Sequence, residues 1–148
     1  MDARRAGYGR ALADSGIAFD ESLYGEVEFA GYERNLPGVL DRIFARDEGV
    51  DGFFFTTHIL ALEAFRYTGE LLGRALADVV TVTSPEAIFL FGGLSKAGKL
   101  IFEPTQWYME ENMLFVFKNK VKLLPSGIQG KNAAILGASA LIWQQENK

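Results

Sequence analysis

Hydrophobic residues recur with a helical period of about 3.6 residues in five stretches of the chain. The first stretch, residues 3–15, ends at Gly16, which is placed for a left-handed cap. In the second, Asn35 is predicted to cap a helix that has Pro37 in its first turn. Its buried side is expected to hold Leu36, Leu40, Ile43 and Phe44. Two later helices are also predicted. One lies around Pro104, where an interruption is expected, and the other covers residues 131–145.

The longest helical stretch covers residues 59–81. Its support is an unbroken apolar stripe formed by Leu62, Phe65, Gly69, Leu72, Leu76 and Val79. Gly69 and Gly73 lie one turn apart on this helix, and each costs up to about 1 kcal/mol of helix propensity relative to alanine. We expect the cost to be compensated by a close approach of the helix to a sheet.

Four other stretches have the patterns of strands. Residues 23–29 alternate apolar and acidic positions, as in a strand with one wet face, whereas residues 52–57 are a continuous apolar run typical of a buried parallel strand. Residues 86–91 and 120–125 complete the set. Helices that alternate with strands predict an α/β fold: a single-domain layered sandwich with a four-stranded parallel sheet and about five helices on its two faces.

Composition narrows the function classes. The chain has 148 residues, a formal net charge of −4 and no cysteine, so we expect one domain with no nucleic-acid partner, no disulfide and no thiolate chemistry. A single histidine, His58, argues against a histidine-rich metal site, and neither a metal nor a cofactor is expected. Without a signal peptide or an apolar run of about 18 residues, we expect a cytoplasmic protein with no membrane partner.

Two parts of the chain resemble different families. Residues 4–65 resemble the C-terminal subdomain of LacI-type repressors, which have the periplasmic-binding-protein-like fold, through Arg4–Tyr8, Gly16-Ile17 and the step Phe53–Leu62. Residues 61–145 resemble the C-terminal part of ROK-family sugar kinases, which have the actin and hexokinase ATPase fold. The matching residues are Leu72-Gly73, Pro85–Ile88, Phe91–Ser95, Glu103-Pro104 and Ala133–Ala138.

These two resemblances lead to the main functional hypothesis. We interpret residues 1–148 as one α/β domain, an engineered chimera of fragments 1–65 and 61–148 joined within a shared helix; a natural recombinant is the alternative. Such a recombined scaffold would be no enzyme and have no native reaction. The second hypothesis is a weak nucleotide- or sugar-binding module at the carboxyl edge of the sheet, and the third is a phosphotransferase fragment.

Gly92, Gly93 and Ser95 are the first group of candidate ligand-binding residues. They follow a predicted strand and precede a predicted helix, where backbone amides can face an anion. The ROK resemblance implies that this stretch lies against bound nucleotide. The alternative is a plain strand-to-helix turn in which Ser95 caps the next helix. No counterpart of the ROK phosphate-binding hairpin, catalytic aspartate, sugar-binding motifs or zinc-binding cysteines is recognised, so no catalytic residue is expected.

Arg4, Thr57 and His58 are the second group. The LacI resemblance implies that Arg4 matches an effector-binding arginine and that Thr57-His58 replaces an Asn-Asp pair. The alternative for Arg4 is a surface ion pair. The alternative for His58 is a capping or partly exposed residue. Any anion is expected to bind weakly, beside Gly93–Ser95 or residues 127–131. Self-association through an exposed strand edge is also expected as an alternative to direct closure of the sheet.

Overall fold

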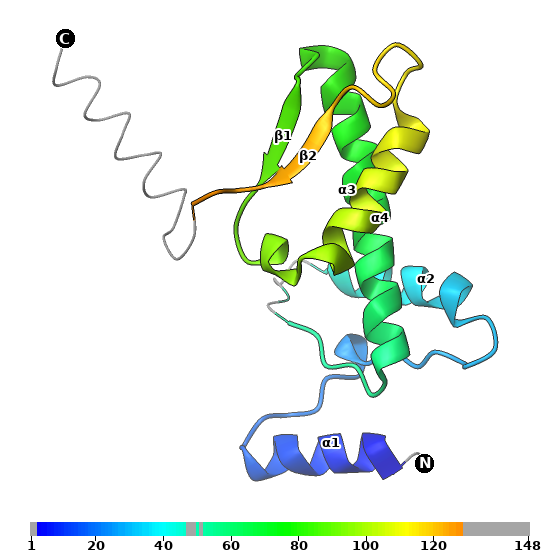
Figure 1. The fold of residues 1–148 in the computed structure, drawn as a ribbon. Helices are drawn as coiled ribbons and strands as arrows, with labels where there is room; N and C mark the ends of the chain where they lie inside the picture. The colour runs from blue at the N-terminus through cyan, green and yellow to red at the C-terminus, as the bar shows by residue number, and fades with distance from the viewer. Residues whose placement is uncertain (1–2, 47–49, 51, 129–148) are drawn as a thin grey trace, which may run out of the picture. The chain divides into compact units, whose positions relative to one another are not determined.

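The computed structural model of the chain describes residues 3–46, 50 and 52–128 (Figure 1). The chain divides into two compact units, Met1–Ala64 and Phe65–Lys148. Helix α3, His58–Thr83, is continuous through this division, so the predicted unbroken helix over 59–81 is confirmed.

The first unit begins with helix α1, Ala3–Asp14, and its C-terminal cap confirms the prediction for Gly16. Gly16 adopts a left-handed φ of +71°. Its amide donates to the carbonyl of Ala13 at 3.0 Å, and the amide of Ile17 donates to that of Leu12 at 2.9 Å. These two bonds are the Schellman arrangement, which satisfies carbonyls that a helix end otherwise leaves without partners.

A short 3-10 turn, η1 (Glu21–Leu23), precedes helix α2, Tyr32–Phe44. The predicted cap at Asn35 is wrong, because Gly31, with a φ of +83°, already opens the helix at Tyr32. The Gly31 carbonyl accepts the amide of Asn35 at 3.2 Å, and Pro37 lies inside the helix. The buried face holds Leu36, Leu40 and Ile43 as predicted, whereas Phe44 is 60% exposed.

The two strands predicted in this unit, 23–29 and 52–57, do not form. Residues 24–29 and 52–55 pair with no neighbouring strand among the described residues. Alternation along a strand specifies its faces but supplies no partner for its backbone, and Phe29 remains 80% exposed. The phenylalanines of the second run instead contact other rings: between ring centroids, Phe53 lies 5.2 Å from Phe44, and Phe54 lies 6.2 Å from Tyr8.

In the second unit, α3 packs along helix α4, Lys99–Asn112 (Figure 1). A methyl group built onto Gly69 would come within 2.7 Å of Pro104 Cβ, and one on Gly73 within 2.7 Å of the Thr105 carbonyl oxygen. The two glycines therefore let the backbones of two helices approach. The close approach expected from the sequence exists, but its partner is a helix rather than a sheet.

The buried side of α3 is shifted from the predicted stripe by about one position along the sequence. Gly69, Gly73, Ala77 and Val80 are buried, whereas Val79 is 47% exposed. Leu62, predicted in the same stripe, is 48% exposed. The helix was predicted from large apolar residues, but its contact with α4 uses the small residues beside them. That choice follows from the close packing of two backbones, which only small side chains permit.

Helix α4 continues through Pro104, so the predicted interruption is wrong. Its buried residues are Ile101, Thr105 and Met109, at the spacing of one helical face. Trp107 is 58% exposed, whereas Met113 is buried. Tyr108 is half-buried beside Trp107, whose ring centroid lies 4.5 Å away.

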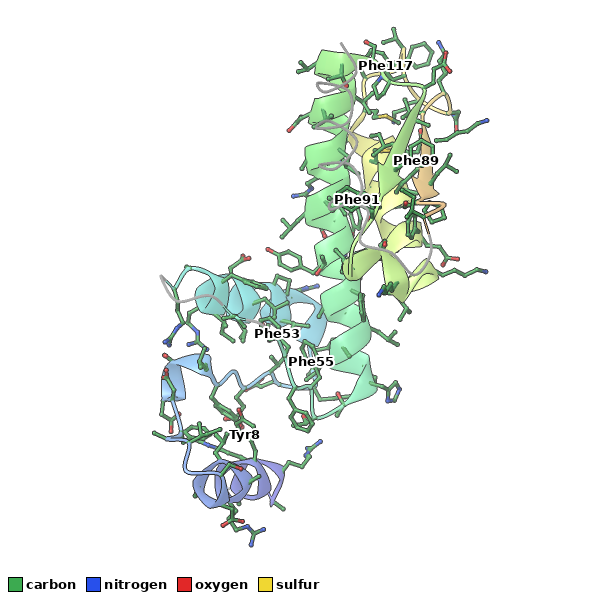
Figure 2. The ribbon with its side chains drawn as sticks, turned by 90° about the vertical axis from the view of Figure 1, so that its left-hand side faces the viewer. Tyr8, Phe53, Phe55, Phe89, Phe91 and Phe117 are labelled. Carbon is green, nitrogen blue, oxygen red and sulfur yellow. The ribbon has the colours of Figure 1, made fainter. Side chains whose placement is uncertain are left out.

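Two parallel strands, β1 (Ala87–Leu90) and β2 (Lys122–Pro125), complete the second unit. Their pairing sets Ile88 opposite Leu123, and both side chains pack against the core. The core itself lies between α3, α4 and the segment before β2, and it consists of Ala77, Val80, Met109, Met113 and Val121. Phe117 packs on the same cluster from the turn after α4 (Figure 2).

The predicted fold class is therefore wrong. The structure has four α-helices and a two-stranded parallel sheet over the described residues, in place of a four-stranded sheet with five helices. Of the predicted strands, 86–91 and 120–125 are present in shortened form, and both are parallel as expected. The last predicted helix, 131–145, lies outside the described residues.

Candidate functional site at the carboxyl edge of the two strands

The carboxyl ends of β1 and β2 lie side by side and bring two glycine-containing turns together. Leu90 pairs with Pro125, and the amide of Ser126 donates to the Leu90 carbonyl at 2.9 Å, which extends the ladder by one bond. Gly92 and Gly127 follow directly. Ligands of parallel sheets collect at this edge, where strands end and helices begin.

The turn after β1 begins with one backbone conformation that glycine adopts most easily. Gly92 has a φ of +96°, and Gly93 opens the short 3-10 turn η2, Leu94–Ala97. The Ser95 hydroxyl donates back to the Gly92 carbonyl at 2.9 Å. Ser95 therefore closes its own turn and does not cap α4, whose N-cap is Gly98 without a side-chain hydrogen bond.

Among the described residues, the surface of this turn is open. No atom of those residues lies within 4 Å of methyl groups built onto Gly92, Gly93 and Gly127, and all three glycines are exposed. A ligand can thus contact the backbone directly, as phosphate-binding turns require. Lys96 and Lys99 are exposed nearby in sequence, and Lys99 lies 3.8 Å from Glu103. Lys131, the far end of the second predicted anion site, lies outside the described residues.

Arg4, Thr57 and His58 belong to the first unit, and the structure gives two of them clear local positions. The Thr57 hydroxyl accepts the amide of Leu60 at 3.5 Å, so Thr57 caps α3. His58 is the first residue of that helix and is exposed. Arg4 is an exposed residue of α1. The cap is therefore supplied by Thr57 rather than by His58.

The neighbouring arginine, Arg5, holds a position that the sequence interpretation missed. Its guanidinium lies over the rings of Phe19 and Tyr24, at 5.6 and 4.6 Å from the centroids, and pairs with Glu21 at 2.5 Å. Such stacking suits the planar guanidinium. The only signal in the sequence was the Arg4-Arg5 pair itself, which does not say which of the two turns inward.

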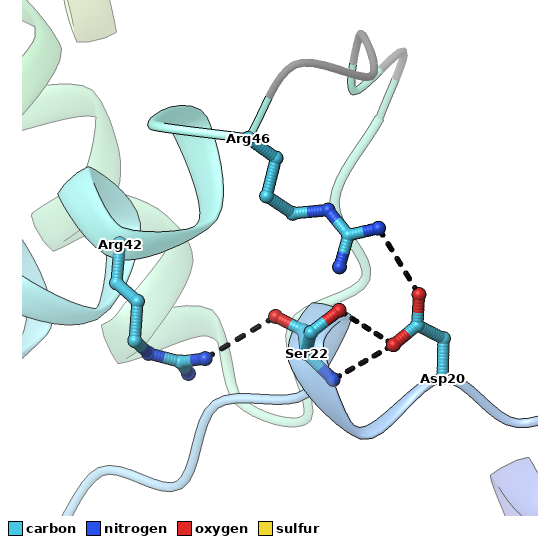
Figure 3. Close-up of polar contacts among 4 residues, drawn as sticks. All are labelled: Asp20, Ser22, Arg42 and Arg46. Carbon is cyan, nitrogen blue, oxygen red and sulfur yellow. Dashed lines mark hydrogen bonds and ion pairs between the residues drawn. The ribbon is translucent and has the colours of Figure 1, made fainter.

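A polar network around η1 was also not predicted (Figure 3). The Asp20 carboxylate accepts from the Ser22 amide at 2.8 Å, the Ser22 hydroxyl at 2.5 Å and Arg46 at 3.1 Å. Arg42 donates to the carbonyls of Ser22 and Tyr24. The hydrogen bonds from Ser22, with a smaller contribution from Arg46, hold the pKa of Asp20 below its ordinary value. These contacts all serve the local fold.

Among the described residues, no three side chains of His, Asp or Glu are grouped as ligands for a metal ion. Within the same part of the chain, no helix is long and apolar enough to cross a membrane. Among the features of the described residues, the open glycine turns at the strand ends are therefore the best suited to bind a ligand. Their backbone amides can donate hydrogen bonds to an anion.

The structure places glycine-containing turns at the ends of two parallel strands, and comparison with known proteins gives the family of this chain. Residues 53–145 match the ROK family, and because this match covers more than half of the chain, the chain belongs to that family. It is 28% identical to a glucokinase of Halalkalibacterium halodurans over 105 residues, 71% of this chain and 29% of the relative.

A glucokinase of Thermotoga maritima is 29% identical over 73 residues, which is 49% of this chain and 23% of that protein. The chain thus spans less than a third of the length of these curated relatives. No solved structure is significantly similar to it.

These matches bear on the predicted join. In a chain of 148 residues, the 105-residue match to the glucokinase must begin at or before residue 44. The similarity therefore crosses residues 61–65, where two fragments were expected to meet. The comparisons support the ROK resemblance and give no support to a LacI-type part or to a chimeric origin.

Proposed function

We propose that the Gly92–Ser95 turn is one wall of a nucleotide-binding site of the sugar-kinase type. The observation that carries this proposal is the open backbone of Gly92 and Gly93 at the carboxyl end of β1, within the part of the chain that matches the ROK family. Phosphate oxygens would accept hydrogen bonds from the amides of this turn. The Ser126–Ile128 turn beside it, held by the Ser126–Leu90 bond, offers further amides.

We further propose that these 148 residues bind nucleotide weakly and transfer no phosphoryl group by themselves. Phosphoryl transfer needs positioned phosphates, a metal ion and a group that orients the acceptor hydroxyl. The described residues offer the first requirement through the turn at Gly92–Ser95, and they group no set of metal ligands. An exposed turn of this kind supplies hydrogen bonds without enclosing its ligand, which favours low affinity.

Amide NMR of the 148-residue chain tests the binding site. Titration with inorganic phosphate, ADP and ATP is expected to shift the amides of residues 92–95 and 126–128. Shifts confined to the opposite edge, near Glu86, would exclude this site. Gly93→Ala is the sharpest variant, because the φ of Gly93 is −62° and its added methyl meets no atom of the described residues. It should fold normally and bind ADP several-fold more weakly.

Gly38→Ala is the matched control for that variant. It is the same chemical change at a site where, again, no described atom lies within 4 Å, but it lies in α2 of the first unit. It is expected to leave ADP binding unchanged. A coupled assay with glucose and ATP tests the second part of the proposal: turnover that Gly93→Ala reduces would show that the chain is catalytic after all.

The recombined scaffold remains the competing proposal. The division into compact units between Ala64 and Phe65 falls within the join predicted at 61–65 and favours it, whereas the long glucokinase match argues against it. A scaffold without affinity should show no change of melting temperature with ATP, ADP or common sugars, while a bound ligand raises that temperature by mass action. A response to sugars alone would favour a sugar-binding module over the nucleotide site.

A further inference from the structure

Helix α1 contains glycines that its packing does not require. Gly7 and Gly9 lie in the middle of Ala3–Asp14, and neither has a positive φ that would favour glycine. No atom of the described residues lies within 4 Å of a methyl group built onto either of them, in contrast to Gly69 and Gly73. Each glycine lowers the equilibrium constant for helix formation about fourfold relative to alanine. In α1 this loss is not compensated by a close approach of another backbone.

Two other properties weaken α1 further. Arg4 and Arg5 lie in its first turn, which contains no acidic residue, and its last turn contains no basic residue. Cations at the N-terminus of a helix oppose the helix dipole. The helix has 12 residues, and none of them is buried. Because isolated helices of this length are marginal in water even when they are rich in alanine, α1 depends on contacts outside itself.

Arg5 and Tyr8 make such contacts with the rest of the first unit. The Tyr8 ring lies 6.0 Å from Phe19, edge to face, and 6.2 Å from Phe54, stacked, between centroids. Arg5 lies three positions before Tyr8, on the same face of the helix, and its guanidinium lies over the rings of Phe19 and Tyr24. Tyr8 remains 42% exposed. The contacts therefore form a half-exposed surface that can separate without opening a buried core.

The segment that α1 contacts has its own attachment to α2. Helix α2 buries Leu40 and Ile43, and Arg42 on the same helix donates to the carbonyls of Ser22 and Tyr24. These bonds involve no residue of α1. The segment around η1 can therefore stay attached to α2 when α1 separates from it.

We propose that α1 is a strap that folds and docks in a single step, and that it opens while α2 keeps its fold. In the closed state, Arg5 and Tyr8 cover part of the rings of Phe19 and Tyr24. In the open state, the helix unfolds and these ring surfaces become accessible. Segments with few buried contacts open at a lower free energy than the core of their domain. The first unit thus has two states, and the balance between them depends on the ring contacts and on the two glycines.

Amide hydrogen exchange of the 148-residue chain, followed by NMR, tests this proposal. After correction for intrinsic rates, the amides of residues 7–14 should exchange at least about 100-fold faster than those of Leu40 and Ile43 in α2. Low concentrations of urea should leave the exchange of α1 nearly unchanged, because the opening of a short segment exposes little surface. Equal protection of α1 and α2 would mean that α1 opens only with the whole unit, and would overturn the proposal.

Tyr8→Ala separates docking from helix propensity, because the two effects have opposite signs. Alanine is the better helix former, so an α1 that folds independently would become more protected in this variant. If folding requires docking, loss of the two ring contacts should lower the protection of residues 9–14 about tenfold. Arg10→Ala is the matched control, since it truncates an exposed side chain of the same helix, and it should leave this protection unchanged or slightly higher. Increased protection in Tyr8→Ala would contradict the coupling of folding to docking.

Gly7→Ala and Gly9→Ala test the contribution of helix formation. Their methyl groups meet no described atom, so each substitution changes the helix equilibrium without changing a contact. Each should raise the protection of α1 about fourfold, and the double variant about fifteenfold. The protection of Leu40 and Ile43 should stay constant in every variant, which also verifies that the rest of the unit is folded. If the glycine variants exchange like the unaltered chain, helix formation is not part of the opening and the strap proposal is wrong.

Discussion

Gly73→Ala should disrupt the packing of α3 on α4. The added methyl group would lie 2.7 Å from the Thr105 carbonyl oxygen, 2.8 Å from the Met109 amide nitrogen and 2.8 Å from Tyr108 Cβ. Two of these three atoms belong to the backbone of α4, so no side-chain rotation removes the clash. The helices have to separate by a large part of an ångström, and Met109, which is fully buried at this crossing, then loses contacts in the core.

The expected magnitude comes from two opposing effects. Alanine improves the intrinsic helix propensity of position 73 by up to about 1 kcal/mol relative to glycine. Overpacking of a well-packed contact costs about 1–3 kcal/mol, and contact with rigid backbone places this site at the upper end. We therefore expect the free energy of unfolding of the second unit to fall by about 2 kcal/mol.

Urea unfolding followed by tryptophan fluorescence measures this change. Both tryptophans, Trp107 and Trp143, belong to the second unit by sequence, so the signal reports on that unit. Gly38→Ala in α2 is the control: its methyl meets no atom of the described residues, and it lies in the first unit, so the urea midpoint that the tryptophans report should stay unchanged. If Gly73→Ala leaves the urea midpoint unchanged or raises it, the close crossing of α3 and α4 is wrong.

Two further predictions concern polar groups. The Thr105 side chain is fully buried and its Oγ1 has no hydrogen-bond partner among the described residues, so Thr105→Val should stabilise the second unit by about 1 kcal/mol in the same urea assay. A loss of stability would show that the hydroxyl has a partner. Because the pKa of Asp20 is lowered in the folded chain, the stabilisation from its carboxylate is complete above the ordinary pKa and disappears as the pH falls through the lowered value. Carboxyl NMR should place its midpoint below the ordinary value, and Ser22→Ala should move it upward more than Arg46→Gln does; the reverse order would contradict the leading role of Ser22.

Elements with a strong local signal were predictable from the sequence. The cap at Gly16 followed from a glycine at the end of a helical period, and α3 followed from a long unbroken apolar pattern. The run 52–57 was equally apolar, yet its phenylalanines contact other rings instead of forming a buried strand. A strand requires a partner that can lie far away in sequence, so periodicity alone does not decide between these outcomes.

The candidate site was located from the sequence only in part. Gly92-Gly93 lay at the end of a predicted strand, and the structure places both glycines at the open edge beside Ser126. The role of Ser95 was not predictable, because a hydroxyl in a tight turn can bond forward to a helix amide or back to a carbonyl, and here it bonds back. Backbone amides leave no side-chain signature, so a turn of this kind identifies an anion-binding edge without naming its ligand.

The glycine pair of α3 shows how a readable pattern can still leave its partner undetermined. The one-turn spacing of Gly69 and Gly73 predicted a close approach, and α4 does lie against both residues. The spacing alone fits a sheet or a helix equally well, because either surface needs only the absence of a side chain. The partner is α4 because this helix presents backbone atoms around Thr105 to the two glycines.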